Sequence, residues 1–344
     1  MNKRLNTKAI FFDTLTIGYL LIVAWIYILN PSEESLMNLS STFMICLLAI
    51  GLGAVISLVA HKSGCLTLGL FVFQSAHEKV LREPTSWHKT FWGWELLIAF
   101  VVTFAVSLQV TGFSFYELTD KAGFEGAKRI FKALLDPDWS ILPRGLLAIV
   151  ETIYIAFLST VIAVPTAFFL AFFCAKNIMR KTKLTMAIYV LLRTLLNVTR
   201  SIEPLIWAIV FSVWVGIGPF AGMLALMLHA VASLAKQYSE IIEGVDEGPI
   251  EGISATGANA IQVVWFAIVP QIILPYISFT IYRWDINVRM ATVIGLVGGG
   301  GIGTLLIQYQ GQALWREVGT LAFLIVVVVW SLDTASAYIR EALK

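Results

Sequence analysis

Three charged residues interrupt a long apolar stretch in the C-terminal third of the sequence. Arg283, Asp285 and Arg289 lie in "TIYRWDINVRM", and no Gly or Pro occurs between Pro275 and Gly295. One helix should therefore carry all three. Asp285 and Arg289 have the i, i+4 spacing of an ion pair, whereas Arg283 and Arg289 are about 240° apart around a helix. One acid cannot neutralise both arginines, so one positive charge remains.

An uncompensated arginine inside a bilayer is costly and is by default a functional hypothesis. Two interpretations stay open for this stretch. In the structural interpretation, the charges form salt bridges between helices or subunits, or they lie at a helix end closer to the outer interface. In the functional interpretation, they are a positive station along the path of a small anion. In the second case, charge-assisted hydrogen bonds would offset the hydration that the anion loses.

The remainder of the chain predicts an all-α polytopic membrane protein. Of its 344 residues, 58% are apolar and 13% are charged, whereas soluble domains carry about 25% charged residues. We expect about eight transmembrane helices, because a helix needs roughly 20 apolar residues to cross a bilayer. The expected spans are 12–29, 40–60, 91–110, 145–174, 201–217, 219–240, 265–296 and 318–336.

Lysine and arginine in the connecting loops predict the orientation. The clearest marker is "AKNIMRKTKL", which has four bases and no acid. Basic loops favour the cytoplasmic side, so we expect both termini and residues 241–264 in the cytoplasm and 111–144 outside. We divide the chain into an N-terminal extension with two spans (1–90), a span with an outer loop (91–144) and a core (145–344).

The segment 246–275, "DEGPIEGISATGANAIQVVWFAIVPQIILP", is a polar interruption on the expected cytoplasmic side. Pro249 and Glu251 suit the first turn of a helix, and Gly257 suits a turn or helix end. A second helix should then run toward Pro270. Two short helices joined at a glycine would project from the membrane, where they could dock another protein.

The spacing of Glu251, Gly257 and Pro270 resembles the cytoplasmic coupling motif of ABC importer permeases. Gly252 and Ile253 depart from it, because they stand where the motif has two alanines. The run "YRWDINVRMATVIGLVGGGGIG" resembles the permease of phosphonate importers more specifically, and the resemblance covers roughly residues 91–342.

The resemblance implies a type I ABC importer permease fold and a homodimer with a pore between its subunits, in the inner (plasma) membrane. Coupling helices within 243–266 would dock on a separate ATP-binding subunit that holds ATP and Mg²⁺. A periplasmic or extracellular substrate-binding protein would deliver phosphonate or a related small phosphorus oxyanion. This chain itself contains no Gly-x-x-x-x-Gly-Lys-Ser/Thr phosphate loop, so we expect neither enzymatic activity nor a bound cofactor.

Other cargoes and classes remain open at this point. The same fold could import phosphite, hypophosphite or another oxyanion. An ion-coupled carrier or channel would need no ATPase, and a membrane enzyme acting on phospholipid head groups is a weaker alternative, because no catalytic constellation is visible. The histidines and the three cysteines are too scattered for a metal site. A net charge of only +2 shows no nucleic-acid footprint.

Two further groups of residues are candidate sites. Arg193, Asn197 and Arg200 share one helix face at i, i+4 and i+7 and precede the apolar run 201–217. We expect them at the inner mouth or the ATPase contact, or as interfacial arginines that only reach toward water, with Glu203 able to pair with Arg200. The run "GLVGGGGIG" lacks the lysine of a phosphate loop and predicts a helix end. Its candidate gate residues are Gly298, Gly299, Gly300, Gly301 and Gly303.

Overall fold

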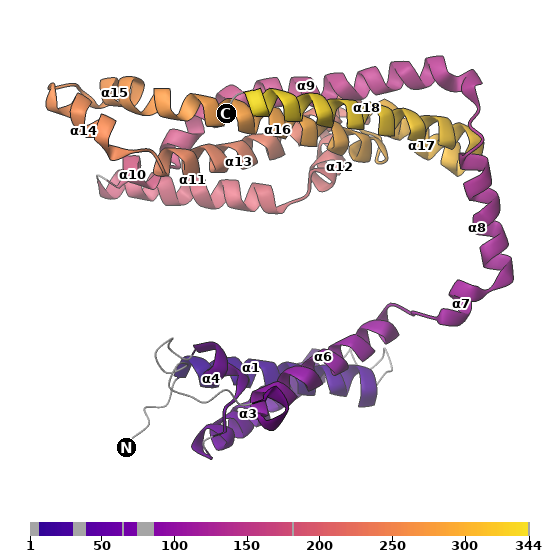
Figure 1. Ribbon diagram of the computed structural model, residues 1–344, viewed down its shortest axis with the longest axis vertical. Helices are drawn as coiled ribbons and strands as arrows, with labels where there is room; N and C mark the ends of the chain where they lie inside the picture. The colour runs from indigo at the N-terminus through magenta and orange to yellow at the C-terminus, as the bar shows by residue number, and fades with distance from the viewer. Residues whose placement is uncertain (1–6, 30–38, 64, 74–85, 181, 343–344) are drawn as a thin grey trace. The chain divides into compact units, whose positions relative to one another are not determined.

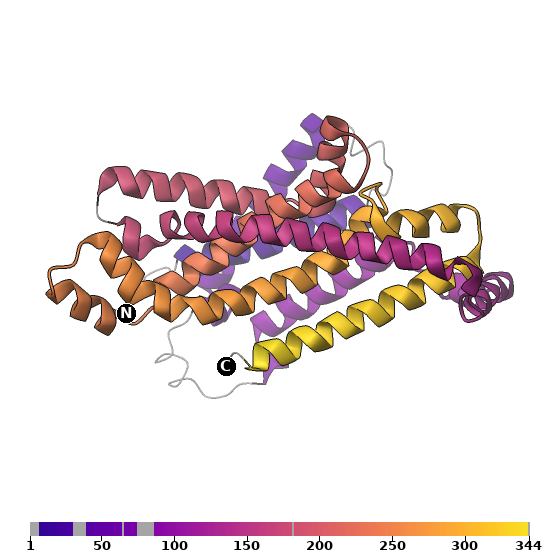
Figure 2. The same cartoon turned by 90° about the horizontal axis from the view of Figure 1, so that it is seen from above.

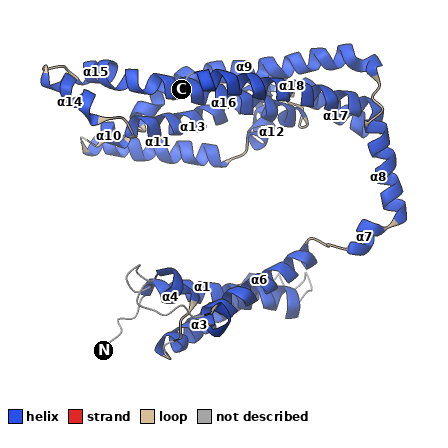
Figure 3. Cartoon of the chain, in the orientation of Figure 1, coloured by secondary structure: helices blue, strands red, loops and turns tan. Residues whose placement is uncertain are grey.

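The computed structural model describes residues 7–29, 39–63, 65–73, 86–180 and 182–342. It divides into two units, Met1–Gly123 and Phe124–Lys344 (Figure 1). Every regular element among the described residues is helical, and no strand occurs in them (Figure 3). The all-α class is confirmed.

The first unit contains three long helices and several short ones. The elements are α1 (Thr7–Ala24) with the π-helical turn η1 (Trp25–Leu29), α3 (Leu39–Lys62), α4 (Leu68–Phe73), η2 (Trp87–Lys89), α6 (Phe91–Val110) and α7 (Phe115–Thr119). α4 is too short to cross a bilayer and packs against α1 and α6. The boundary that we place at residue 90 therefore falls within this unit, between η2 and α6.

Two buried carboxylates hold α4 in place. Asp13 accepts a hydrogen bond from the backbone N–H of Gly69 and lies 2.9 Å from Nε2 of His61. Oε2 of Glu95 accepts a bond of 3.1 Å from the backbone N–H of Leu68, while its Oε1 is buried without a partner among the described residues. The start of α4 is thus tied by its backbone to acids on α1 and α6.

The second unit is a bundle of long helices. α9, α13, α16 and α18 run alongside one another, with α14 and α15 at one end and α17 at the other (Figures 1 and 2). The elements are α8 (Lys121–Leu134), which begins before the unit boundary, η3 (Trp139–Ile141), α9 (Leu142–Phe173), α10 (Lys176–Met179), α11 (Lys183–Ser201), α12 (Pro204–Val215), α13 (Pro219–Glu243), α14 (Glu247–Ala255), α15 (Ala260–Val263), η4 (Val264–Ile268), α16 (Val269–Gly295), α17 (Gly301–Gly311) and α18 (Trp315–Ala342).

Small side chains let α9 and α13 approach closely. Packing of helices in a bilayer relies on close backbone approach, which alanine and glycine permit. The two helices pack extensively. Their fully buried alanines are Ala156, Ala163, Ala167 and Ala171 on α9, and Ala221, Ala225, Ala230, Ala232 and Ala235 on α13.

Seven helices among the described residues are long and apolar enough to cross a membrane, and the number is eight if α11 and α12 form one span. The expectation that residues 201–217 form a span of their own is wrong. α12 has 12 residues, about 18 Å of helix, whereas the hydrocarbon core is about 30 Å thick. α11 and α12 meet at an angle of 92°. Ile202 and Glu203 are extended, and Pro204 has no backbone N–H, so the helix cannot continue through them.

Candidate functional site

α16 carries the charged residues singled out in the sequence. Nη2 of Arg289 lies 2.6 Å from Oδ2 of Asp285, the i, i+4 pair that the spacing predicts, and 3.6 Å from Oδ1 of Asp333 on α18. Sequence reasoning missed Asp333. The signal that could have found it is an acid within the apolar run 318–336, because ionisable residues inside spans are rarely without a role.

Arg283 lies on a different side of α16 and is buried, with 7% of its surface exposed. Among the residues that the structure describes, it forms no ion pair and no hydrogen bond. It lies within electrostatic range of Arg200 and of His229, which is on α13. A guanidinium that is buried without an acid is costly, so this position needs water or an anion to compensate it.

The structure separates the residues expected at the inner mouth. Arg193 lies in the middle of α11, where Nη1 is 2.8 Å from Oε1 of Glu243 and 3.0 Å from the hydroxyl of Tyr189. Arg200 lies in the last turn of α11, and Glu203 follows at the bend before α12. The pair that we considered between them is not among the ion pairs of the described residues.

Asn197 lies between these two groups on α11. It is half-buried, and its carbonyl oxygen accepts a hydrogen bond of 2.8 Å from the hydroxyl of Ser201. Because α11 and α12 together form a broken helix, Arg200 and Glu203 lie within this pair of helices and not before it. The proline after Glu203 is the sequence signal for this break. Our prediction instead follows the apolar run after it, which suggests a separate span.

The segment 246–275 has the helix–glycine–helix form that the sequence predicts. Asp246 caps α14 by accepting a bond of 3.2 Å from the backbone N–H of Gly248. Gly257 follows α14 with φ +82°, a conformation that favours glycine. Glu251 is exposed on α14. The second helix differs from the prediction, because α15 is short and passes into the π-helical turn η4 before Pro270 in the first turn of α16.

Paired hydrogen bonds tie the start of α14 to α16. The side chain of Gln271 accepts a bond of 3.0 Å from the backbone N–H of Asp246 and donates one of 3.3 Å to its carbonyl oxygen. A cavity of about 550 Å³ lies beside this connection, between α14, α15 and the end of α13. Its lining includes the carboxylates of Glu243, Glu247 and Glu251.

The glycine-rich run forms a tight connection between α16 and α17. Gly298, Gly300 and Gly301 have φ values of +88°, +80° and +71°. The backbone N–H of Ile302 donates 2.8 Å to Oγ1 of Thr152 on α9. A Cβ on Gly303 would collide with the carbonyl oxygen of Thr292. These glycines therefore serve close backbone packing at the end opposite to α14 and α15 (Figure 1).

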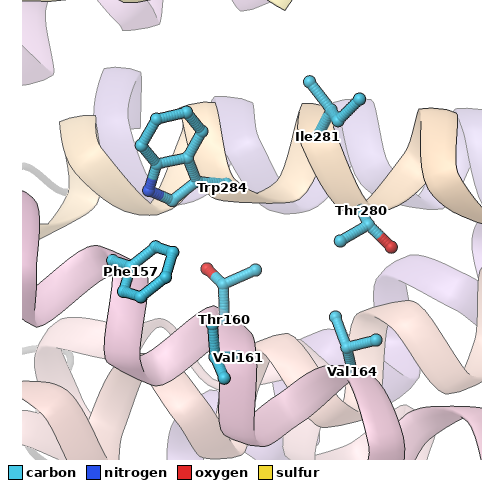
Figure 4. A pocket seen from close by; sticks show the side chains of 7 residues that line it. All are labelled: Phe157, Thr160, Val161, Val164, Thr280, Ile281 and Trp284. Carbon is cyan, nitrogen blue, oxygen red and sulfur yellow. The ribbon is translucent and has the colours of Figure 1, made fainter.

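A second cavity, of about 360 Å³, lies between α9 and α16. Figure 4 shows Phe157, Thr160 and Val164 of α9 facing Thr280 and Trp284 of α16 across it. None of the charged residues of α16 lines it. Its apolar walls suit hydrocarbon better than an oxyanion.

Residues 163–344 match the family described as "Binding-protein-dependent transport system inner membrane component". The chain belongs to this family. This membership agrees with the helix–glycine–helix segment and with the long apolar helices of the second unit. The resemblance to importer permeases noted in the sequence is thus confirmed.

Within the binding-protein-dependent transport family, three similarities stand out. The chain is 35% identical over 210 residues to the phosphite transport system permease protein PtxC of Stutzerimonas stutzeri, covering 61% of this chain and 75% of that protein. It is 41% identical over 119 residues to the putative cryptic phosphonate transport system permease protein PhnE2 of Escherichia coli K12, covering 35% and 98%. A structure of the MetNI methionine ABC transporter matches with a TM-score of 0.52 and 21% identity, covering 60% and 99%. This last match confirms the expected type I importer permease fold.

Proposed function

We propose that this chain is the transmembrane subunit of an ATP-driven importer that moves phosphonate or a related small phosphorus oxyanion into the cell. The observation that carries the cargo assignment is Arg283, a buried cation in the middle of α16 without an acidic partner among the described residues. Such a group favours an anion over a neutral or cationic cargo. Relatives named for phosphite and phosphonate transport support the same class.

The family and the two ends of the bundle support the following assignment of partners. An ATP-binding subunit, which holds ATP and Mg²⁺, docks on α14 and α15 from the cytoplasm, and Glu251 and Gly257 belong to that contact. A substrate-binding protein delivers cargo at the opposite end, near α17. Two copies of the chain form a pore in the inner membrane, and both termini lie in the cytoplasm.

The helices of this chain offer a continuous connection from coupling segment to substrate path. Gln271 joins α14 to the start of α16, and Arg283 lies about 18 Å further along the same helix. Asp285 and Arg289 follow, and α16 ends directly before the glycines proposed as the outer gate. A displacement of α14 by the ATPase would therefore move α16, its charges and the gate together.

Phosphite, hypophosphite and other oxyanions are alternative cargoes of the same mechanism. An ion-coupled carrier or channel is the alternative from a different class. The discriminating experiment deletes the gene for this chain and measures cellular uptake of phosphorus-labelled phosphite, methylphosphonate and phosphate, with and without vanadate. We expect vanadate-sensitive uptake of at least one of them to disappear. Uptake that needs this chain but resists vanadate would support the carrier.

A further inference from the structure

The arginines of the second unit differ in how their charge is balanced. Arg193, Arg289 and Arg316 each lie within 4 Å of a carboxylate. Arg283 is the more deeply buried residue, yet no described acid pairs with it. Burying a guanidinium without an acid costs free energy. We therefore expect water or a bound anion, and not an acid of this chain, to compensate the charge of Arg283.

Two further basic side chains lie near Arg283. Arg200 and His229 come from two other helices, and Arg200 lies within electrostatic range of both Arg283 and His229. Nδ1 of His229 is buried and has no hydrogen-bond partner among the described residues. A polar nitrogen left unpaired in this position is available to a ligand, because an unmade bond to a buried group is costly.

The bend between α11 and α12 brings a helix N-terminus close in sequence to Arg200. α12 begins at Pro204 immediately beyond the bend, and the side chain of Glu203 makes no capping bond to any described residue. Broken helices inside membrane transporters commonly point such an end at an anionic group. Arg200 is exposed, whereas Arg283 is buried.

We propose that Arg283, Arg200 and His229 form an anion-binding site at the bend between α11 and α12, and that it takes the phosphorus oxyanion during its passage. The assignment rests on the proposed function for the identity of the anion. Two guanidinium forks supply N–H donors to several oxygens of one tetrahedral group, which a point charge such as that of a lysine does not. The unpaired Nδ1 of His229 is left for a further hydrogen bond with the same group. Glu203 lies within electrostatic range of His229 and keeps the site weak enough to release its ligand.

The charges further along α16 have a different role in this scheme. Arg289 is shared by Asp285 and Asp333, so that cluster contains two acids and one base. The charge of Arg289 is thus already compensated within the chain, and an oxyanion would compete with two carboxyl groups for it. Arg289 therefore holds α16 against α18, and the anion is directed toward Arg283.

The test uses the full-length chain, purified in lipid nanodiscs, with phosphite, methylphosphonate and phosphate as separate probes observed by phosphorus NMR. Wild-type protein should broaden the line of at least one probe. Arg283→Gln and Arg200→Gln should each weaken that binding about tenfold or more, because each removes a charge-assisted hydrogen bond. Arg316→Gln, an exposed arginine paired with Asp136, is the matched control and should leave binding unchanged.

Two results would overturn the site: wild-type protein that binds none of the probes, or a folded Arg200→Gln variant that binds as wild type does. Arg200 is exposed, so its replacement should not prevent folding even if Arg283→Gln does. Uptake in cells separates this proposal from the proposed function. If wild-type cells import a probe and Arg283→Gln and Arg200→Gln cells import it equally well, the site is wrong and the importer stands. If wild-type cells import none of the probes, the importer assignment fails, and the cargo given to the site fails with it.

Discussion

Arg289 contacts two carboxylates, and one of them is buried. That burial determines how much stability the protein would lose if Arg289 were replaced. The side chain of Asp285 is 5% exposed, while those of Arg289 and Asp333 are 47% and 43% exposed. Replacing Arg289 by Gln leaves Asp285 buried without its counterion. We expect Arg289→Gln to lower the free energy of unfolding by about 1–3 kcal/mol, between the values for exposed and buried pairs. Thermal unfolding in detergent would measure the loss.

A second variant separates this effect from a lost substrate contact. Asp285→Asn combined with Arg289→Gln removes both charges of the pair, so most of the stability should return. If the double variant is as unstable as Arg289→Gln alone, the ion pair is not the reason for the loss.

Gly257 and Gly252 offer a matched pair for the coupling segment. Gly257 has φ +82°, and Gly252 is helical; no described atom lies within 4 Å of a Cβ built on either. A side chain at Gly257 is therefore strained only through its backbone, by about 1 kcal/mol or more. We expect Gly257→Val to displace α15 relative to α14 and to lower substrate-stimulated ATP hydrolysis by the assembled importer, with membrane insertion preserved. Gly252→Val should retain most of this hydrolysis, and equal loss in both variants would contradict the role of the turn.

The sequence predicts those contacts of the candidate functional residues that join positions close together in the chain. The pair of Asp285 and Arg289 follows from i, i+4 spacing, and the turn at Gly257 follows from glycine chemistry. Arg200 and His229 come from helices that are distant in sequence from Arg283, and no spacing rule places them beside it. Tertiary packing alone shows that Arg283 is buried without an acid.

At the scale of elements, the connection between α16 and α17 depends on glycines that cannot be enlarged. A Cβ on Gly303 meets the backbone of Thr292, whereas one on Gly311, at the end of the same helix, meets no described atom within 4 Å. We expect Gly303→Ala to cost about 1–3 kcal/mol by overpacking and Gly311→Ala to be nearly neutral. Thermal unfolding of the two variants measures the difference, and equal midpoints would show that the close approach is not required.

The spans were predictable because long apolar runs have few alternatives in a bilayer. The bend between α11 and α12 was not, because the apolar run 201–217 suggests a helix that continues to the membrane surface. Extended backbone at Ile202 and Glu203 and the proline at 204 interrupt it instead. Local propensity gives a position for such a break, but its angle depends on packing against α13 and α16.

At the scale of the whole molecule, the second unit contains the entire region that matches the transport family. We predict that a chain beginning at residue 61 still assembles and transports, since two spans are removed together and the orientation of the remainder is kept.

The same deletion removes Asp13 and leaves α4 and Glu95 without part of their packing. Glu95→Gln in the shortened chain should raise its yield, because it removes the charge of a buried carboxyl.

Uptake of labelled phosphite, methylphosphonate and phosphate by cells that make the chain beginning at residue 61 checks whether this shortened chain still transports. Full-length chain in the same cells is the control. A shortened chain that inserts correctly but transports none of the probes would show that residues 1–60 are needed for function.

We propose that ATP hydrolysis on a partner drives a phosphorus oxyanion through this chain. The most direct measurement reconstitutes the permease with its ATP-binding subunit and its substrate-binding protein in proteoliposomes and follows uptake of labelled phosphite, methylphosphonate and phosphate. We predict that at least one probe accumulates only with ATP and the binding protein, that vanadate stops this accumulation, and that Gly257→Val abolishes it. Accumulation that proceeds without ATP, or an importer that carries none of the three probes, would contradict it.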